Sequence, residues 1–469
     1  MVIGQNDSLE RTEPSTLLRC RSFKYVGICL LILLIASCTE SNRVTSQPSA
    51  THTPLLTTQT PSPPVETPIL TKVITASPTA TVLPTPSPLP SPTPIVVTEP
   101  CGQHLPIVLP QDEATFDWQQ PNLSPELIPE DVQPALEHFF ANPNDVSLVV
   151  YQLGYEGIGF YHNADRPMPL ASVSKLIQLV AYGNAVDAGT LDPMQPVTVE
   201  ELERYYLPRS DLGAHNAALR ELDTEALTLD DVAWMMMRHS ANSASDYLHD
   251  LLGQDVIEQT AIELGMGGQS AVCPWIGRFL TMGNPTRTQP NTVAIDQLAI
   301  NLDRYGHEVI WLSEQYTQDE AFRQTARRYW GNRQVSLSAQ QVFIEQLETR
   351  GTTRDYANLR GQLVSKQAGN DLIRAHLGWP LARFASNQER YASIGYKNGT
   401  FPGVLTSVYY AEPFWADTPI VVALFYENLP NRTYQRWRRD FPHDDMAHWL
   451  MSNPNALHIM HVLRDGAEE

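Results

Sequence analysis

Apolar residues along the chain predict strands toward both ends of a folded region, with helices between them. The segment VSLVVYQL, Val146 to Leu153, is apolar and rich in β-branched residues, which is typical of a strand. Its predicted hairpin partner is Glu156 to Tyr161, with glycines near the turn. Strands return in three short segments separated by glycine, proline and aspartate: Tyr391 to Lys397, Val404 to Tyr410 and Ile420 to Tyr426.

The middle of the chain carries the apolar spacing of helices. This spacing is present in Ser172 to Ala188, and Thr228 with Asp231 is a capping signal for the helix Leu229 to Arg238. Further helices are expected over Val256 to Leu264, over Val293 to Leu302 and, interrupted near Pro454, over Asp444 to Leu463. This order predicts an α/β (α+β) fold: an antiparallel sheet built from both chain ends and flanked by helices, with an inserted all-helical subdomain over roughly residues 190–385.

Residues 1–38 have the pattern of an export signal. Basic residues precede the apolar run Tyr25 to Ala36, which is shorter than the about 20 residues that a spanning helix needs. The junction before Cys38 resembles a bacterial lipobox, in which the cysteine is acylated and becomes the mature N-terminus. The alternative is an uncleaved anchor helix. Both predict an extracytoplasmic protein, and the first predicts one that is lipid-anchored to the cell membrane.

Residues 39–100 are predicted to form a disordered linker. From Asn42 to Pro100 the chain is mainly threonine, proline and serine, with few charges and no aromatic residue. Such a segment cannot bury a core, and a proline-rich chain extends by about 3.1 Å per residue. The folded domain is therefore expected over residues 101–469.

The cysteines agree with export. Of the five, Cys101 and Cys273 alone lie beyond the signal region. An oxidising compartment permits a disulfide between them, and two separate buried thiols are the alternative. The net charge of −20 excludes nucleic acid as a probable class of partner, because phosphate binding needs a basic surface.

A serine and a lysine at the start of a predicted helix are the first candidate for chemistry. In the segment SVSK, Ser172 opens the helix and Lys175 lies three residues later on the same face. A serine hydroxyl needs a base to act as a nucleophile, and a lysine of lowered pKa can serve as one.

Two further short motifs follow along the chain. Ser240 and Asn242 stand at the end of the next predicted helix, and Lys397, Gly399 and Thr400 stand at the end of a predicted strand. Taken singly, the first is an ordinary helix end and the second an ordinary Asn-Gly hairpin turn.

In this order the three motifs resemble those of the penicillin-recognising serine hydrolases, and within them the class A β-lactamases, which use S-x-x-K, S-D-N and K-T-G. The resemblance extends from Asp145 to about Tyr426 and includes the runs PLASVSKL and KNGTFPGVLT. It implies the β-lactamase/D,D-peptidase fold and an exported serine hydrolase that opens β-lactam amides through an acyl-enzyme. It also implies a β-lactam or D-Ala-D-Ala-like small substrate, no cofactor, no metal and a monomer.

The resemblance assigns the catalytic roles. Ser172 attacks the carbonyl, Lys175 accepts its proton, and Ser240 passes a proton to the leaving nitrogen. The backbone N–H groups of Ser172 and Thr400 form the oxyanion hole.

The resemblance also assigns the binding roles. Asn242 orients the substrate amide and Lys175. Lys397 attracts the substrate carboxylate, beside Gly399 and with help from the Thr400 hydroxyl.

Three departures separate the chain from the class A pattern. Ala241 and Asn398 replace the usual middle residues of the second and third motifs, which vary in the wider superfamily. More seriously, class A enzymes hydrolyse the acyl-enzyme with a loop glutamate, and no glutamate occurs between Glu263 and Glu308. The expected loop, 274–290, has only arginines as charged residues.

The missing glutamate leaves the substrate open. The alternatives are a peptidoglycan D,D-peptidase or penicillin-binding esterase, and a non-catalytic cell-wall-binding descendant. The stretch between the second and third motifs is longer than usual by about one small helical insert, which could supply a substitute base: Glu308, Glu314, Asp296 or Asp303. His443, Asp444, Asp445 and His448 are expected to form a solvated helix start and not a metal site.

Overall fold

The structure is a computed structural model that describes residues 101–103, 105, 128–224, 226–332, 335–364 and 370–465, all within one compact unit. The predicted signal, the Cys38 lipidation site and the predicted linker lie outside the described residues. Within the described ranges, no helix is both long enough and apolar enough to span a membrane.

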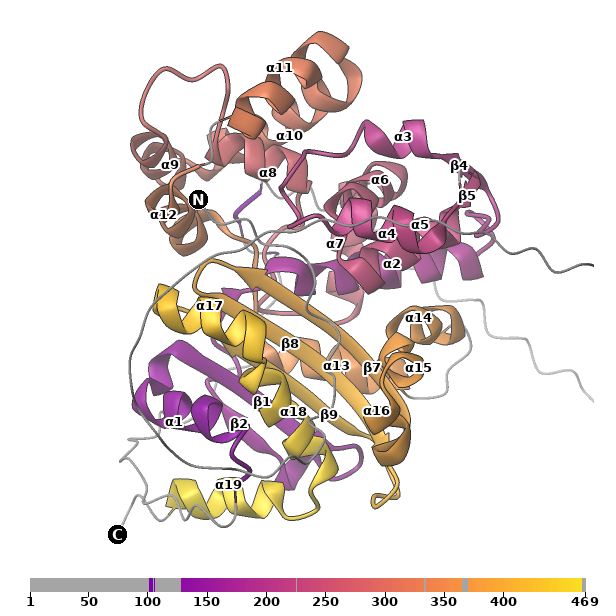
Figure 1. The fold of residues 1–469 in the computed structure, drawn as a ribbon, viewed down its shortest axis with the longest axis vertical. Coiled ribbons are helices and arrows are strands. Elements are labelled where there is room, and N and C mark those ends of the chain that lie inside the picture. The colour runs from indigo at the N-terminus through magenta and orange to yellow at the C-terminus, as the bar shows by residue number, and fades with distance from the viewer. Residues whose placement is uncertain are drawn as a thin grey trace, which may run out of the picture. The chain divides into compact units, whose positions relative to one another are not determined.

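A five-stranded antiparallel sheet in the order β2-β1-β9-β8-β7 forms the centre of the fold (Figure 1). As predicted, strands from both ends of the folded region pair in this sheet, because Val146 of β1 pairs with Tyr426 of β9. The α/β (α+β) architecture predicted from the sequence is therefore confirmed. The strands of the sheet are β1 (Val146–Gln152), β2 (Phe160–His162), β7 (Tyr391–Phe401), β8 (Val404–Pro413) and β9 (Ile420–Tyr426).

Successive side chains along each strand point to opposite faces of the sheet, and both faces are buried. On β9, Val421, Ala423 and Phe425 join one core, while Val422 and Leu424 join the other. Both faces are apolar because helices cover both of them. Helices α1 (Gln133–Ala141) and α18 (Pro442–Ser452) pack on one face, and α13 (Thr353–Val364) packs on the other against β1, β8 and β9 (Figure 1).

The helical subdomain predicted for residues 190–385 needs one correction. Helix α13 (Thr353–Val364) lies inside this range but packs against the sheet. Its Tyr356 and Leu359 are buried in the same core as β9. The subdomain is therefore interrupted in sequence by a helix of the sheet layer.

Most of the remaining helices between the sheet segments form two groups. The first contains α2 to α7 and α14 and shares the core on the sheet face that α13 covers. The second contains α8 to α12 and has an apolar core of its own, in which α8 and α10 pack together. The second group agrees with the predicted helical insert.

The helices are α1 (Gln133–Ala141), α2 (Lys175–Asp187), α3 (Val199–Glu203), α4 (Ala214–Leu222), α5 (Leu229–Trp234), α6 (Asn242–Leu252), α7 (Gln254–Glu263), α8 (Trp275–Met282), α9 (Asn291–Ala299), α10 (Leu302–Gln318), α11 (Glu320–Asn332), α12 (Leu337–Leu347), α13 (Thr353–Val364), α14 (Asn370–Leu377), α15 (Trp379–Arg383), α16 (Ala385–Arg390), α17 (Asn431–Asp440), α18 (Pro442–Ser452) and α19 (Ala456–Asp465). Two short strand pairs join β3 (Met168–Pro169) to β6 (Arg350–Gly351), and β4 (Pro196–Thr198) to β5 (Ala226–Thr228).

Local signals explain several boundaries. Thr228 caps α5 through a reciprocal capping box with Asp231, as predicted. The helix then changes to a π-helical turn, Met235–His239, instead of continuing as α-helix to Arg238. The hairpin partner of β1 begins only at Phe160, because Glu156–Ile158 forms a 3-10 turn.

The environment of Asp444 also corrects an expectation. Its carboxylate accepts hydrogen bonds from Ser407 at 2.8 Å, Tyr409 at 2.8 Å and Tyr396 at 3.2 Å, and the side chain of His443 is buried. The start of α18 is therefore held against the sheet by hydroxyl groups and is not a solvated helix end.

Candidate active site

Ser172 lies in a short 3-10 turn, Ala171–Ser174, and not in the first turn of the α-helix, which begins at Lys175. The turn is tight, since Ala171 has a φ of 47°, a left-handed conformation that is rare for a residue with a side chain. The preceding residue is fixed because Leu170 N–H donates to the Thr349 carbonyl at 2.9 Å. A constrained turn therefore presents Ser172 ahead of α2.

Lys175 is the hub of the site. Its fully buried ammonium nitrogen lies 3.2 Å from Ser172 Oγ, 2.7 Å from Asn242 Oδ1 and 2.7 Å from the Ser240 carbonyl oxygen. The structure thus brings the first two predicted motifs into direct contact. The geometry allows Lys175 to take the Ser172 proton when the amine is neutral.

Burial provides the neutral amine. Removal from water lowers the pKa of Lys175 to about 7, and the positive charge of Arg278 acts in the same direction. The carboxylates of Asp211 and Asp246 oppose this effect. A substantial fraction of Lys175 is therefore unprotonated near neutral pH.

Ser240 connects the two lysines of the site. It ends the π-helical turn in a left-handed conformation with a φ of 65°. Its hydroxyl oxygen lies 3.0 Å from Lys397 Nζ and 3.5 Å from Lys175 Nζ. A proton given up by Ser240 can therefore be replaced from either side.

The third motif lies within β7 and not in a turn. The strand continues to Phe401, and the chain reverses at Pro402 and Gly403, where Gly403 has a φ of 82°. Lys397 is buried, and its ammonium also donates to the Asn398 carbonyl at 2.8 Å. The Asn-Gly sequence is therefore part of a sheet edge.

Gly399 allows this edge to approach Ser172. A Cβ at this position would lie 2.4 Å from the Leu170 carbonyl oxygen and 2.8 Å from the Ser172 nitrogen. Strand β7 therefore runs directly beside the Ser172 turn. The Thr400 hydroxyl is hydrogen-bonded to Tyr434 of α17 at 3.0 Å, which reduces its freedom to contact a substrate.

Two further site residues, Trp275 and Asp246, were not anticipated from the sequence. The Lys175 ammonium lies 4.9 Å from the centre of the Trp275 ring, at the first residue of α8. The buried Asp246 carboxylate accepts the N–H groups of Trp275 and Ile276, each at 2.7 Å. Asp246 follows Asn242 by one helical turn on α6, a spacing that could have pointed to it.

Asp246 is unusual because it is a fully buried carboxylate. Burial raises its pKa to about 7, against the opposing effect of the two backbone N–H donors and of Lys175. It therefore titrates in the same range as the lysine that it influences.

The carboxylates considered as substitute bases do not contact Ser172 or Lys175 directly. Glu308 contacts Arg287 and Asn284, Asp296 accepts a hydrogen bond from Gln346, and Asp303 accepts one from Gln103. Among the described residues, none of these carboxylates, nor that of Glu314, forms a hydrogen bond or ion pair with Ser172 or Lys175.

A disulfide joins Cys101 to Cys273, with the Cα atoms 5.8 Å apart. The second cysteine lies two residues before Trp275. The adjacent backbone is also paired, since Ala271 N–H donates to the Gln103 carbonyl at 2.8 Å. The loop in front of α8 is thus fastened to the start of the described chain.

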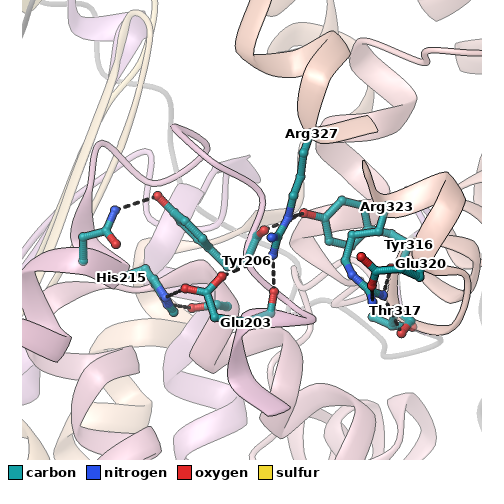
Figure 2. Close-up of polar contacts among 10 residues, drawn as sticks. Glu203, Tyr206, His215, Tyr316, Thr317, Glu320, Arg323 and Arg327 are labelled. Carbon is teal, nitrogen blue, oxygen red and sulfur yellow. Dashed lines mark hydrogen bonds and ion pairs between the residues drawn. The ribbon is translucent and has the colours of Figure 1, made fainter. Parts of the chain in front are cut away.

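A second polar network connects the helical insert to the start of α6, and Figure 2 shows its part from Arg327 through Glu203 to His215. Arg327 of α11 contacts Glu203 of α3, whose carboxylate lies 3.1 Å from Nε2 of the buried His215. The other ring nitrogen of His215 lies 2.7 Å from the hydroxyl of Ser243, the neighbour of Asn242. The insert and the start of α6 are therefore linked through three side chains.

The described residues contain no cluster of three or more histidine, cysteine, aspartate or glutamate side chains that could hold a metal ion.

Comparison with known proteins finds a family model that matches part of the chain. The model of the beta-lactamase enzyme family matches residues 131–297, which include the first two motifs. The match confirms the resemblance to penicillin-recognising serine hydrolases seen in the sequence. No curated protein matches the chain.

Solved structures with a similar fold include three from this class. The beta-lactamase from Sphaerobacter thermophilus DSM 20745 is 19% identical, with a TM-score of 0.42, over 70% of this chain and 97% of that one. A variant of the class A beta-lactamase of the last common ancestor of Gram-negative bacteria is 13% identical, with a TM-score of 0.39, over 68% and 99%. A PBP-A mutant in an acyl-enzyme complex with penicillin G is 15% identical, with a TM-score of 0.38, over 68% and 97%.

Proposed function

We propose that the chain is an exported serine hydrolase that opens β-lactam amides through an acyl-enzyme on Ser172. One observation carries the proposal: the buried Lys175 ammonium contacts Ser172, Asn242 and the Ser240 carbonyl together. A surface S-x-x-K pair would be solvated, and its lysine would stay protonated at neutral pH.

Acylation begins when neutral Lys175 removes the proton from Ser172 Oγ. The oxygen adds to the lactam carbonyl, and the negative charge that develops on the carbonyl oxygen is stabilised by the N–H groups of Ser172 and Thr400. Each such donor is worth about 3–4 kcal/mol in the transition state. The close approach of β7 at Gly399 supports this assignment.

The second half of acylation breaks the carbon–nitrogen bond. The leaving nitrogen takes the proton of Ser240 Oγ, and the hydroxyl recovers a proton from Lys175 or Lys397. Both ammonium groups lie within 3.5 Å of this oxygen. The product is an ester on Ser172, with the amine released or retained in the opened ring.

Hydrolysis of that ester needs a water molecule and a base. A penicillin-binding D,D-peptidase or esterase is therefore a second candidate function. The observation that favours it is Trp275, the first residue of α8, whose apolar ring faces Lys175 in the stretch 274–290 where the class A pattern has its glutamate. An indole cannot accept a proton from water, so a penicillin ester on Ser172 would be long-lived.

The sequence supports an extracytoplasmic location for this activity. The signal pattern, the lipobox-like Cys38 and the threonine- and proline-rich spacer would place the domain outside the cell membrane on a lipid anchor.

Labelling with a fluorescent penicillin tests the proposal. Wild-type protein should acquire one label, and Ser172→Ala should acquire none. Ser174→Ala is the matched control, because its hydroxyl lies in the same turn but donates only to the Ala171 carbonyl. Equal labelling of Ser172→Ala and wild type would overturn the mechanism, and an absence of labelling in both would favour a non-catalytic wall-binding role.

Mass spectrometry over time separates the two candidate functions. A label lost within seconds indicates a β-lactamase, and one that persists for many minutes indicates a penicillin-binding peptidase or esterase.

A further inference from the structure

We propose that Arg360 is a positioning residue of this site, a buried cation that makes the site selective for substrates that carry a carboxylate. The inference rests on the proposed function, because it concerns the same acyl transfer. It assigns a role to a residue that lies in none of the three motifs and touches neither Ser172 nor Lys175.

Arg360 lies on α13, underneath the strand that pairs with β7. The residue is fully buried, and its Nη2 donates to the Val408 carbonyl of β8 at 3.2 Å. Val408 is the ladder partner of Lys397. Residues directly opposite each other in an antiparallel pair point to the same face, so Lys397 projects on the face of the sheet that α13 covers.

Among the described residues, the guanidinium has no other hydrogen-bond partner, and its Nε and Nη1 are buried without one. The guanidinium carbon lies 5.9 Å from the centre of the Tyr410 ring. Within the described ranges, no carboxylate forms an ion pair with Arg360, Lys175 or Lys397. An unpaired buried charge is costly, and an apolar side chain of similar volume would fill this position at lower cost.

Three buried basic side chains therefore occupy one region, and no carboxylate of the described residues forms an ion pair with any of them. Lys175 and Lys397 meet at the Ser240 hydroxyl, and Arg360 lies behind Lys397. Like charges in a medium of low dielectric constant repel one another strongly. The carboxylate of a substrate would supply the missing negative charge, whereas a neutral substrate would not.

The charged surroundings agree with this interpretation. The pKa of Lys397 lies well below its ordinary value because of burial, the charge of Lys175 and the charge of Arg360. Burial also lowers the pKa of Arg360 to about 9, and Tyr410 alone opposes the shift.

The other charged groups that face these cations come from several elements. Towards Lys175 they are Asp211, Asp246 of α6 and Arg278 of α8; towards Tyr410 they are Arg374 of α14 and Glu412 of β8. Of these carboxylates, Asp211 and Asp246 act on Lys175, and Glu412 acts on Tyr410. None of the three offsets the charge of Arg360 directly.

The test compares a penicillin with its methyl ester, which lacks the carboxylate. The second-order rate of Ser172 acylation is measured for both compounds with wild type, Arg360→Met, Arg360→Gln and Arg360→Lys. We expect the preference for the free acid to fall about tenfold in the Met and Gln variants and to stay within about threefold of wild type in the Lys variant. The acid limb of the rate against pH should also move upward in the Met and Gln variants, since a removed cation raises the pKa of the neighbouring lysines.

A preference that is unchanged in Arg360→Met and Arg360→Gln would overturn the inference, and so would an equal loss in the Lys variant, which would indicate a packing role. Urea unfolding identifies any variant that does not fold. Such a variant is set aside, and the inference is judged from the variants that fold. Equilibrium binding of both compounds in a Ser172→Ala background separates this inference from the proposed function. If wild type is not acylated but binding preference still depends on the charge at Arg360, the proposed function fails alone; if binding shows no preference, the inference fails.

Discussion

At the scale of single residues, the site depends on which of its buried groups carries the proton. Lys175 and Asp246 are both fully buried, and burial moves their pKa values toward each other, each to about 7. The neutral form of Lys175 is the one that can act as a base. In the proposed mechanism, the protonation of this pair therefore sets the pH at which Ser172 becomes reactive.

The first prediction concerns the pH profile of acylation. Because the folded pKa of Lys175 is lowered, the fraction of neutral amine grows as the pH rises through about 7. The rate of penicillin labelling should therefore rise between pH 6 and pH 8 and then level off. Ser174→Ala should show the same rise in labelling rate with pH. A wild-type rate that is flat over this range would contradict the role of Lys175.

The second prediction concerns Asp246→Asn. The carboxylate stabilises protonated Lys175, so its removal should lower the pKa of Lys175 and shift the acid limb to lower pH. An asparagine oxygen can still accept a backbone N–H from the first turn of α8. Stopped-flow labelling over a pH series measures the shift, and an upward displacement would refute the assigned sign.

At the scale of elements, the 3-10 turn before α2 and the edge strand β7 lie side by side at Ser172. Their separation is limited by Gly399, since any Cβ there would collide with the turn. The same turn is held from behind by the Thr349 carbonyl, which precedes β6. The position of Ser172 is thus fixed by segments far apart in the sequence.

Gly399→Ala should consequently push β7 away from Ser172 and weaken the oxyanion site. We expect the acylation rate to fall by about 100-fold or more, on the scale of the loss of one oxyanion donor. Gly157→Ala is the control, because no atom lies within 4 Å of a Cβ at that exposed glycine. Near-normal acylation of Gly399→Ala would show that the close approach is not needed.

Much of this arrangement could be predicted from the sequence. The strand Ile420 to Tyr426 was predicted with the bounds that β9 has, because its ends are marked by proline and a polar turn. The motif residues Ser172, Lys175 and Ser240 were expected together, and they lie together. The strong Asn-Gly turn signal was overridden by the pairing of β7 with β8, which extends to Phe401.

Other features could not be predicted, namely the positions of Trp275 and Arg360 and the turn at Ala171. They depend on tertiary packing, which residue spacing does not encode. Trp275 contacts Lys175 from α8, and Arg360 lies behind Lys397 on α13. The core of the helical insert positions α8, and the sheet positions α13. Both side chains belong to ordinary amphipathic helices when the sequence is considered alone. The left-handed turn at Ala171 was missed for a similar reason, because a residue without a special backbone preference occupies it.

At the scale of the whole molecule, the described chain is closed by one covalent cross-link. The Cys101–Cys273 disulfide spans 172 residues and so restricts the unfolded chain strongly. Cys101→Ser should lower the free energy of unfolding by about 3–5 kcal/mol in oxidising buffer. Urea unfolding with and without reductant measures this, and reductant should abolish the difference between variant and wild type.

The same cross-link decides where a mechanical load would enter the protein. A pull on the chain that precedes Cys101 passes through the sulfur atoms to Cys273, so that residues 102–272 bear none of it between the two cysteines. The load arrives two residues before Trp275, at the helix that covers Lys175. In a domain held on a stretched tether, tension would therefore act first on the segment in front of α8, and strand β1 would bear it only after reduction of the disulfide.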